Sequence, residues 1–435
     1  MKFELIKISM IMFYKYCLFI FTNFFKKYIL KQIPSERLYL LKDISNLLLD
    51  YNVVYIKFFQ QLCLEEELLY PNEKNYLLDF TDNVPFKDSE IDIKYLNSMC
   101  EKYNIKLKNK KPISSGIIAL AYKGTINKDN QNKDIIIKLK KIGIEERYNN
   151  AYENLLFISK YLNYIPIIHN FNIEKILKDT RDNILIQTDF NNEVNNLIEY
   201  NEICKDYPEY TSPLPIKEIT DNYKNCIVMS DITGMTIRDV LNLDKIDKDN
   251  FGRLLVKHGL LSVLYFGIAN ADFHAGNAFF YKNVSDDIPY QIGIIDFGIC
   301  TKCSRENMLA HYTFFVEVIT KKNYSKLKDI AHIFMHEKDI FFNLSTNDKS
   351  KLFDELIGHI KHMHEHDEQI DPIFFFKLLK TLKNSNLSFS KEFNQVITSM
   401  NACSSLGKSL NNNLNQQIED ICNEFNRLEN ALKID

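Results

Sequence analysis

Two short polar stretches, separated by an apolar run, constrain this chain more than any other feature. The first is NADFHAGN at 270–277, in which Asp272 and Asn277 are five positions apart. The second is the triplet Asp296-Phe297-Gly298, which directly follows the strand-like run QIGII at 291–295. Either stretch alone would usually be a turn or a helix cap. Their order and the strand-like run between them indicate a composite site.

The residue types in these stretches suit a metal ion that is bound to phosphates. Mg²⁺ prefers oxygen ligands and is usually held by one or two protein groups together with phosphate oxygens. In phosphoryl transfer, the Asp before Phe-Gly and a loop Asn hold the metal, and an Asp five residues before that Asn accepts a proton. We therefore predict Asp296 and Asn277 as metal ligands, Asp272 as the catalytic base, and ATP and Mg²⁺ as cofactors.

A candidate phosphate-binding lysine lies upstream of these stretches. Lys138 ends the apolar run Ile135–Ile137, in the second strand of a predicted hairpin. Without the downstream motif, a surface lysine on an edge strand would be the better interpretation. A lysine of this kind is oriented by a glutamate on a neighbouring helix. Glu193 is the best candidate, because it lies on a helical stretch with an apolar face.

The loop before this hairpin would cover the phosphates. It contains Ser114, Ser115, Gly116 and Ile117, and it has a single glycine. Small side chains let backbone N–H groups approach phosphate oxygens. We assign these four residues, together with Lys138, to nucleotide binding.

The order of predicted elements indicates an α+β fold with two lobes. Residues 1–105 are expected to form a helical extension with an apolar segment at 8–25. Residues 106–234 are expected to form a small β-rich lobe with a helical insert, and residues 235–435 a larger helical lobe that carries the catalytic and metal loops. At 435 residues and 46% hydrophobic composition, the chain can bury two cores.

The composition limits the classes of partner and the cellular compartments that fit this chain. The net charge of −3 and the absence of a basic stripe argue against a nucleic-acid partner. Nine scattered cysteines, an odd number, fit a reducing intracellular compartment better than a disulfide framework. The apolar segment 8–25 is interrupted by Lys15, so that spanning a membrane, lying on one and packing inside the protein all stay open.

With these residues in place, the chain resembles the UbiB, or aarF-domain, family of atypical kinase-like proteins. The segment 272–277 is similar to the end of the family motif H-x-D-x-H-P-G-N, with Asn270 in place of the first histidine and Ala275 in place of the proline. His274 stands where ordinary kinases carry a lysine, so we assign it to the catalytic set. Lys138 and Glu193 are 55 positions apart. This long spacing resembles that of the family, which carries a helical insert between the two residues.

A further segment resembles the K-x-G-Q signature of the family, which lies on an N-terminal extension that restricts access to the active site. Lys57 and Gln60 match it, and Phe59 replaces the glycine. The resemblance implies a regulatory role for these two residues. It also implies a two-lobed protein-kinase-like fold, phosphotransferase or ATPase activity, and a lipid, a quinone-pathway component or a protein as acceptor near a membrane, with coenzyme Q biosynthesis as the family context.

Two other functions remain open at this point. A small-molecule kinase of the aminoglycoside or choline type has a similar catalytic loop, but the 55-residue gap and the segment around Lys57 argue against it. A non-catalytic, nucleotide-gated binding module would fit the altered accessory motifs. It would tolerate Asp272→Asn with nucleotide binding retained, whereas an enzyme would not.

Overall fold

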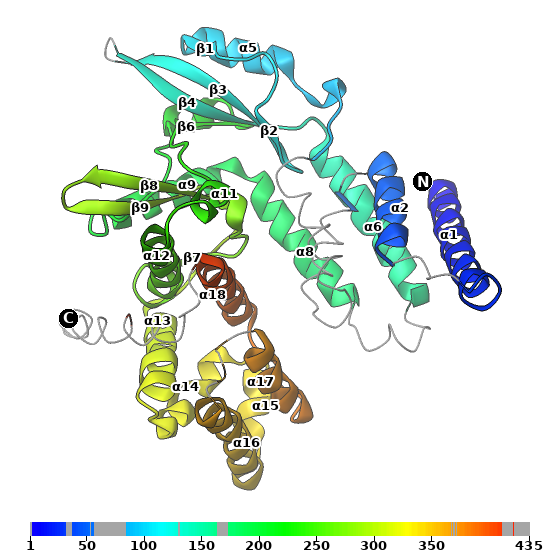
Figure 1. Ribbon diagram of the computed structural model, residues 1–435, viewed down its shortest axis with the longest axis vertical. Helices are drawn as coiled ribbons and strands as arrows, with labels where there is room; N and C mark the ends of the chain where they lie inside the picture. The colour runs from blue at the N-terminus through cyan, green and yellow to red at the C-terminus, as the bar shows by residue number, and fades with distance from the viewer. Residues whose placement is uncertain are drawn as a thin grey trace. The chain divides into compact units, whose positions relative to one another are not determined.

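The computed structural model describes residues 2–31, 37–52, 54–55, 84–128, 131–162, 173–366, 368, 370, 372–410 and 421. The chain divides into two compact units. Unit 1 comprises Met1–Val194 and Pro215–Asp231, and unit 2 comprises Asn195–Leu214 and Ile232–Asp435. The boundary falls within one helix, α9 (Phe190–Cys204). Figure 1 shows the elements of both units.

Unit 1 contains a five-stranded sheet in which β1, β3, β4 and β6 follow one another and β2 pairs with β3. The strands are β1 (Ile105–Leu107), β2 (Ser114–Ser115), β3 (Ala119–Lys128), β4 (Gln131–Lys140) and β6 (Cys226–Ser230). All of these pairs are antiparallel. The hairpin expected before Lys138 is therefore confirmed as β3–β4.

Burial of the side chains alternates along β4, which shows which face of the sheet is covered. Ile135, Ile137 and Leu139 are buried, whereas the residues between them are only half-buried. The buried set joins a core that includes Leu96 and Met99 of α5 (Ile93–Lys102). The period of two places Lys138 on the opposite face from this core.

The other helices of unit 1 are α1 (Lys2–Tyr28), α2 (Arg37–Tyr51), α6 (Ile144–Leu162), α8 (Ile173–Thr188) and α10 (Lys217–Asn222), with a short 3₁₀ turn η1 (Asp88–Glu90). Ile219 of α10 joins the core with Leu96 and Met99. A second core is formed by residues of α6 and α8, and Ile44 of α2 packs against it. In this second core, Tyr148 and Tyr152 of α6 pack with Ile184 of α8 and with Val54 and Tyr55. Helices α6 and α8 lie between β4 and α9 in the chain.

Unit 2 is mostly helical, with two small sheets. Its helices are α11 (Ile237–Leu241), α12 (Lys245–Leu264), α13 (Arg305–Tyr312), α14 (Leu327–Phe334), α15 (Lys338–Asn343), α16 (Thr346–Glu365), α17 (Pro372–Asn384) and α18 (Lys391–Leu410), with a π-helix η3 (Thr313–Thr320) and 3₁₀ turns η2 (Ala275–Asn277) and η4 (Tyr324–Lys326). One sheet has the order β5 (Tyr210–Thr211), β9 (Ile288–Ile294), β8 (Ala278–Ser285). The other pairs β7 (Ile268–Asn270) with β10 (Cys300–Lys302). A unit that combines a five-stranded antiparallel sheet with helices and a second, mostly helical unit confirm the α+β, kinase-like fold class.

Helices α12 and α18 approach each other closely because glycine lies at two contact points. A Cβ on Gly407 would come within 2.8 Å of the backbone oxygen of Gly252, and one on Gly259 within 2.9 Å of the Cβ of Cys403. Any larger residue would force the helices apart. This packing supports the buried strand β7, from which the loop around Asp272 starts.

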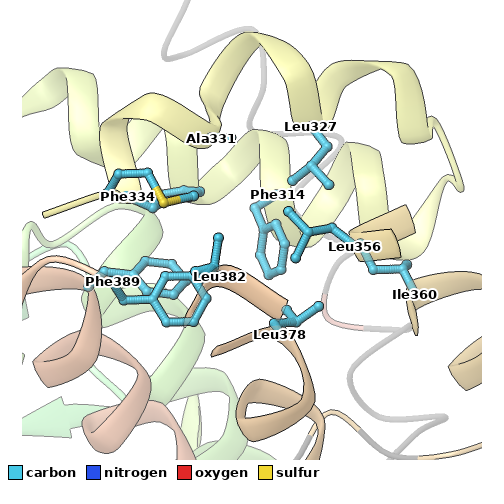
Figure 2. A pocket seen from close by; sticks show the side chains of 11 residues that line it. Phe314, Leu327, Ala331, Phe334, Leu356, Ile360, Leu378, Leu382 and Phe389 are labelled. Atoms are coloured by element: carbon cyan, nitrogen blue, oxygen red, sulfur yellow. The ribbon is translucent and has the colours of Figure 1, made fainter. Parts of the chain in front are cut away.

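The helices that follow η3 enclose an apolar pocket (Figure 2). Its lining comes from η3, α14, α16, α17 and α18 and carries no polar surface. Leu382, fully buried, and Phe334 are among these residues. The pocket belongs to the helical core of unit 2, and the described part of the region beyond residue 331 is helical, as expected.

Among the helices of the described ranges, α1 included, none combines the length and the apolarity that crossing a bilayer demands. The domain boundaries expected at residues 105 and 234 stay predictions.

Candidate functional site

Lys138 and Glu193 form an ion pair in unit 1. The Nζ of Lys138 donates to Oε1 of Glu193 at 2.7 Å. The carboxylate is almost fully buried, with 2% of the side chain exposed, whereas Lys138 keeps 20%. Lys138 is fixed in register, because it pairs with Ala121 on one side and Ile227 on the other. The pair predicted across 55 positions is therefore in contact.

The start of helix α9 favours a negative charge at Glu193. Asp189 precedes the helix, and its Oδ1 accepts a hydrogen bond of 3.0 Å from the backbone N–H of Asn191. Glu193 lies in the first turn. The N-terminal end of a helix carries a partial positive charge, which stabilises a carboxylate there. Both the helix end and Lys138 thus place positive charge beside the carboxylate of Glu193.

The loop assigned to phosphate contact is a tight hairpin. Ser114 and Ser115 form β2, and the N–H of Gly116 donates to the oxygen of Ala119 at 2.9 Å. Ser114 is exposed and Ser115 is buried, while Ile117 packs on the second core of unit 1. The N–H of Gly116 is therefore already used within the turn. A Cβ on Gly116 would meet only Ala119, at 3.6 Å, so the fold of the turn does not require glycine.

In unit 2, three hydrogen bonds between side chains and the backbone join four residues. The amide of Asn277 donates to the oxygen of Asp272 at 3.0 Å. The N–H of Asp272 donates to Oδ1 of Asn270 at 3.0 Å, and the amide of Asn270 donates to the oxygen of Asp296 at 2.7 Å. Asn270 and Asn277 are buried, whereas Asp272 and Asp296 are partly accessible. Two buried amides thus hold two accessible carboxylates in place.

His274 orders the turn between Asp272 and Asn277. Its Nδ1 accepts a hydrogen bond of 3.1 Å from the N–H of Gly276, and its oxygen accepts one of 2.9 Å from the N–H of Asn277. An accepting Nδ1 assigns the proton of the neutral ring to Nε2. In this structure His274 acts as a cap of η2.

Asp296 has a left-handed backbone, with φ of 66°. Such a conformation is uncommon outside glycine and clusters at functional sites, where the surroundings must stabilise it. Here Oδ1 of Asp296 accepts from the N–H of Gly298 at 3.1 Å, and the oxygen accepts from Asn270. The N–H of Ile295 donates to the oxygen of Asn277 at 2.9 Å, which places the two assigned metal ligands on adjoining segments.

Two asparagines that the sequence did not single out support these loops. One is Asn270, described above. The other is Asn196 on α9, whose amide donates to the oxygen of Phe297 at 2.9 Å. The oxygen of Phe297 also accepts from the thiol of Cys300 at 3.5 Å. The only sequence signals for these residues were their places in or beside the family motifs.

The structure thus brings together Lys138 with Glu193 in unit 1, and Asp272, His274 and Asn277 with Asp296 in unit 2. Lys57 and Gln60 lie outside the described residues, so their regulatory role stays a prediction. The donor set in unit 2, a carboxylate and an amide on adjoining segments, matches what Mg²⁺ takes from a protein when phosphate supplies the other oxygens.

Comparison with known proteins identifies the family. The family model of the ABC1 atypical kinase-like domain matches residues 91–331. An uncharacterized aarF domain-containing protein kinase of Arabidopsis thaliana, named as chloroplastic, is 23% identical over 253 residues. The match covers 56% of this chain and 45% of that relative, so the chain spans under half of the relative's length.

A solved structure of Rv3197 with erythromycin from Mycobacterium tuberculosis is similar at 14% identity, with a TM-score of 0.44. The similarity covers 81% of this chain and 90% of that one. The match of the family model, which spans more than half of the chain and includes every described residue of the candidate site, decides the assignment: this chain belongs to the ABC1 atypical kinase-like family, the UbiB or aarF-domain proteins.

Proposed function

We propose that this atypical kinase-like protein binds ATP with Mg²⁺ and transfers the terminal phosphoryl group to an acceptor. The observation that carries the proposal is the pair of Lys138 and Glu193 at 2.7 Å, buried at its carboxylate end. In kinases a strand lysine paired with a helix glutamate binds the nucleotide phosphates, and the pair must form for activity. Lys138 stays 20% exposed on the face of the sheet opposite the core, so a ligand can reach it.

The residues of unit 2 supply the remaining roles. Asp296 and Asn277 would hold Mg²⁺, which neutralises phosphate charge when bound. Asp272 has an accessible carboxylate and would accept the proton of the acceptor hydroxyl. The hydroxyl oxygen forms a bond to the terminal phosphorus, the bond to the bridging oxygen breaks, and ADP leaves. If water takes the place of the hydroxyl, the same residues give ATPase activity.

The acceptor class is a proposal that rests on the family alone. We propose a lipid, a component of a quinone pathway such as coenzyme Q biosynthesis, or a protein at a membrane. We also propose a reducing compartment inside the cell, because no two cysteines within the described residues form a disulfide. Burial raises the pKa of Cys204 to about 12 and that of Cys303 to about 11, which makes them poor nucleophiles.

The decisive experiment is a titration with Mg-ATP that follows thermal stability and phosphate release. A ligand present at about 100 times its dissociation constant should stabilise the folded state by ~2.7 kcal/mol. Wild type should show a magnesium-dependent shift of the melting temperature, and Lys138→Ala and Asp296→Asn should lose it. The exposed Lys110 and Asp286 provide matched controls, Lys110→Ala and Asp286→Asn, which should keep it.

The comparison uses the ligand-induced shift of each variant, so a variant that is merely less stable is not mistaken for one that fails to bind. Phosphate release then separates an enzyme from a nucleotide-gated binding module, since only the enzyme turns over. Absence of any magnesium-dependent shift in wild type would refute the proposal.

A further inference from the structure

Helix α1 contacts the protein along one side. It lies beside α2 (Figure 1), and Nζ of Lys15 donates to Asp43 of α2 at 2.6 Å. Among the α1 side chains that the structure describes, the half-buried ones on this side are Ile11, Lys15, Phe19, Thr22, Asn23 and Lys26. The ion pair with Asp43 fixes which side of the helix faces α2.

The opposite side of α1 is apolar and open. Ten large side chains are 43–70% exposed there, and they extend along the helix: Met10, Phe13, Tyr14, Tyr16, Leu18, Ile20, Phe21, Phe24, Phe25 and Tyr28. At 3.6 residues per turn they cover more than half of the circumference. A contiguous apolar surface of this size marks an interaction site.

Charge distinguishes the candidate occupants of this surface. Residues 2–31 contain six lysines and one glutamate. Lys7 and Lys27 are exposed and flank the apolar arc on its two edges, and Lys31 is exposed beyond the end of the helix. Lysines at the rim of an apolar, aromatic-rich face match an anionic lipid surface, where headgroups meet the charges and acyl chains meet the rings.

We propose that α1 lies in the plane of an anionic membrane surface, with Phe13, Phe21 and Phe24 among the side chains that enter the acyl boundary and Lys7 and Lys27 at the headgroups. The pairing of Lys15 with Asp43 keeps one side of α1 against protein, which suits a helix that lies on a bilayer. A second copy of the chain is a poorer occupant, because facing α1 helices would bring together two sets of like charges. The inference does not depend on nucleotide binding.

The chain contains no tryptophan, so single tryptophans report on α1 without background. Phe21→Trp places the probe on the outward side, and Phe19→Trp places it on the side toward α2 as the matched control. With vesicles that contain phosphatidylglycerol and phosphatidylcholine, the emission of the Phe21→Trp protein should shift to the blue and be quenched by brominated lipid. The emission of the Phe19→Trp protein should change far less. Equal responses, or none at Phe21→Trp, would overturn the orientation.

Sedimentation with vesicles tests the charge and the occupant. Removing Lys7, Lys27 and Lys31 by substitution to Gln should weaken binding about fivefold per lysine, since each contributes ~1 kcal/mol near an anionic surface. The triple variant Phe13→Ser, Phe21→Ser, Phe24→Ser should lose binding and keep its melting shift with Mg-ATP. Equal binding of wild type to phosphatidylcholine alone would overturn the proposal. A dimer in lipid-free solution that this variant abolishes would also overturn it, in favour of a second copy.

Discussion

The side-chain amide of Asn270 donates a hydrogen bond of 2.7 Å to the backbone oxygen of Asp296, while its Oδ1 accepts one of 3.0 Å from the N–H of Asp272. One buried side chain therefore connects the loop of the proposed base with the loop of the proposed metal ligand. It also stabilises the left-handed backbone of Asp296. Asn270 touches neither nucleotide nor acceptor in the proposed reaction, so it is a positioning residue.

Replacing Asn270 by Ala should raise the Mg²⁺ concentration needed for half-maximal activity and lower kcat, together by about 10–100-fold, the usual effect of losing a residue that orients metal ligands. The measurement is activity, or the melting shift with ATP, as a function of Mg²⁺. Asn270→His, which restores the family residue, should recover part of the loss. The exposed Asn343 gives the control variant Asn343→Ala. An unchanged Mg²⁺ dependence in Asn270→Ala would contradict the positioning role.

Substitutions of Lys138 and Glu193 should be strongly coupled in their effect on the free energy of unfolding. Lys138→Met leaves a carboxylate that is 98% buried without its lysine, and breaking a buried pair in this way costs about 3–5 kcal/mol. Glu193→Gln should cost less, because Lys138 can reach solvent. In the double variant the loss should be smaller than the sum of the two single losses. Denaturant unfolding of the four proteins measures this coupling.

The exposed pair of Lys205 and Glu202 provides a matched reference for that cycle, because both side chains are more than 60% exposed. Its coupling should stay below ~1 kcal/mol. Equal coupling in the two cycles would show that burial of Glu193 does not strengthen the pair of Lys138 and Glu193.

His258 should make unit 2 sensitive to acid. Burial lowers the pKa of this imidazole to about 3, among the rings of Tyr200, Tyr210 and Phe266. Since the pKa is near 6.5 in the unfolded chain, the unfolded state binds the proton first as the pH falls. The stability is therefore fully present above pH 6.5 and is lost progressively as the pH falls toward 3.

The variant His258→Phe should flatten the dependence of the melting temperature on pH between 6.5 and 3. The exposed His336 gives the control variant His336→Gln, which should keep the slope of wild type. His311, whose pKa burial lowers to about 4, contributes a further part of the slope that neither variant removes. Parallel curves for wild type and His258→Phe would rule out His258 as a source of the acid sensitivity.

Local spacing made part of the candidate site readable from the sequence. Asp272, Asn277 and Asp296 lie in short loops beside strands, so their type and separation are visible along the chain. The pairing of Lys138 with Glu193 was chosen from helix character and from the family-like spacing of the two residues, and only the folded sheet and α9 bring them together. The β3–β4 hairpin was readable because two apolar runs around a polar turn are also a local pattern.

Contacts between residues that are far apart in the chain leave no local pattern in the sequence. Asn270 and Asn196 act on backbone oxygens 26 and 101 positions away, and many asparagines in this chain could have been chosen. The close contact of Gly407 with Gly252 depends on how two helices pack, which their sequences do not fix. The side of α1 that faces α2 was equally hidden, because the helix is apolar over most of its surface.

Lys141 is a buried cation whose removal should stabilise unit 1. Its side chain is fully buried, 3.8 Å from a carboxylate oxygen of Glu90, which already binds Arg147 at 2.6 Å. The ammonium also lies over the ring of Phe86, and within the described residues it has no hydrogen-bond partner. Burial lowers the pKa of Lys141 to about 8, with Glu90 raising it and Arg147 lowering it further.

The sign of the effect follows from that pKa. The unfolded chain holds the proton up to a pH near 10.5, whereas the folded protein releases it near 8. Between these values the unfolded state binds more protons, so the stability of wild type should rise with pH. Below pH 8 the folded protein carries the cost of burying the charged ammonium of Lys141. Glu90 compensates this charge only in part, because it also pairs with Arg147.

Lys141→Met keeps the apolar length of the side chain and removes the charge. At pH 7 it should raise the melting temperature above that of wild type, and the advantage should shrink as the pH rises from 8 to 10.5. Melting curves over this range measure the effect, with Lys110→Met at an exposed position as the control. If Lys141→Met is less stable than wild type at pH 7, the ammonium contributes more through Glu90 and Phe86 than its burial costs, and the lysine is held as a stabilising contact.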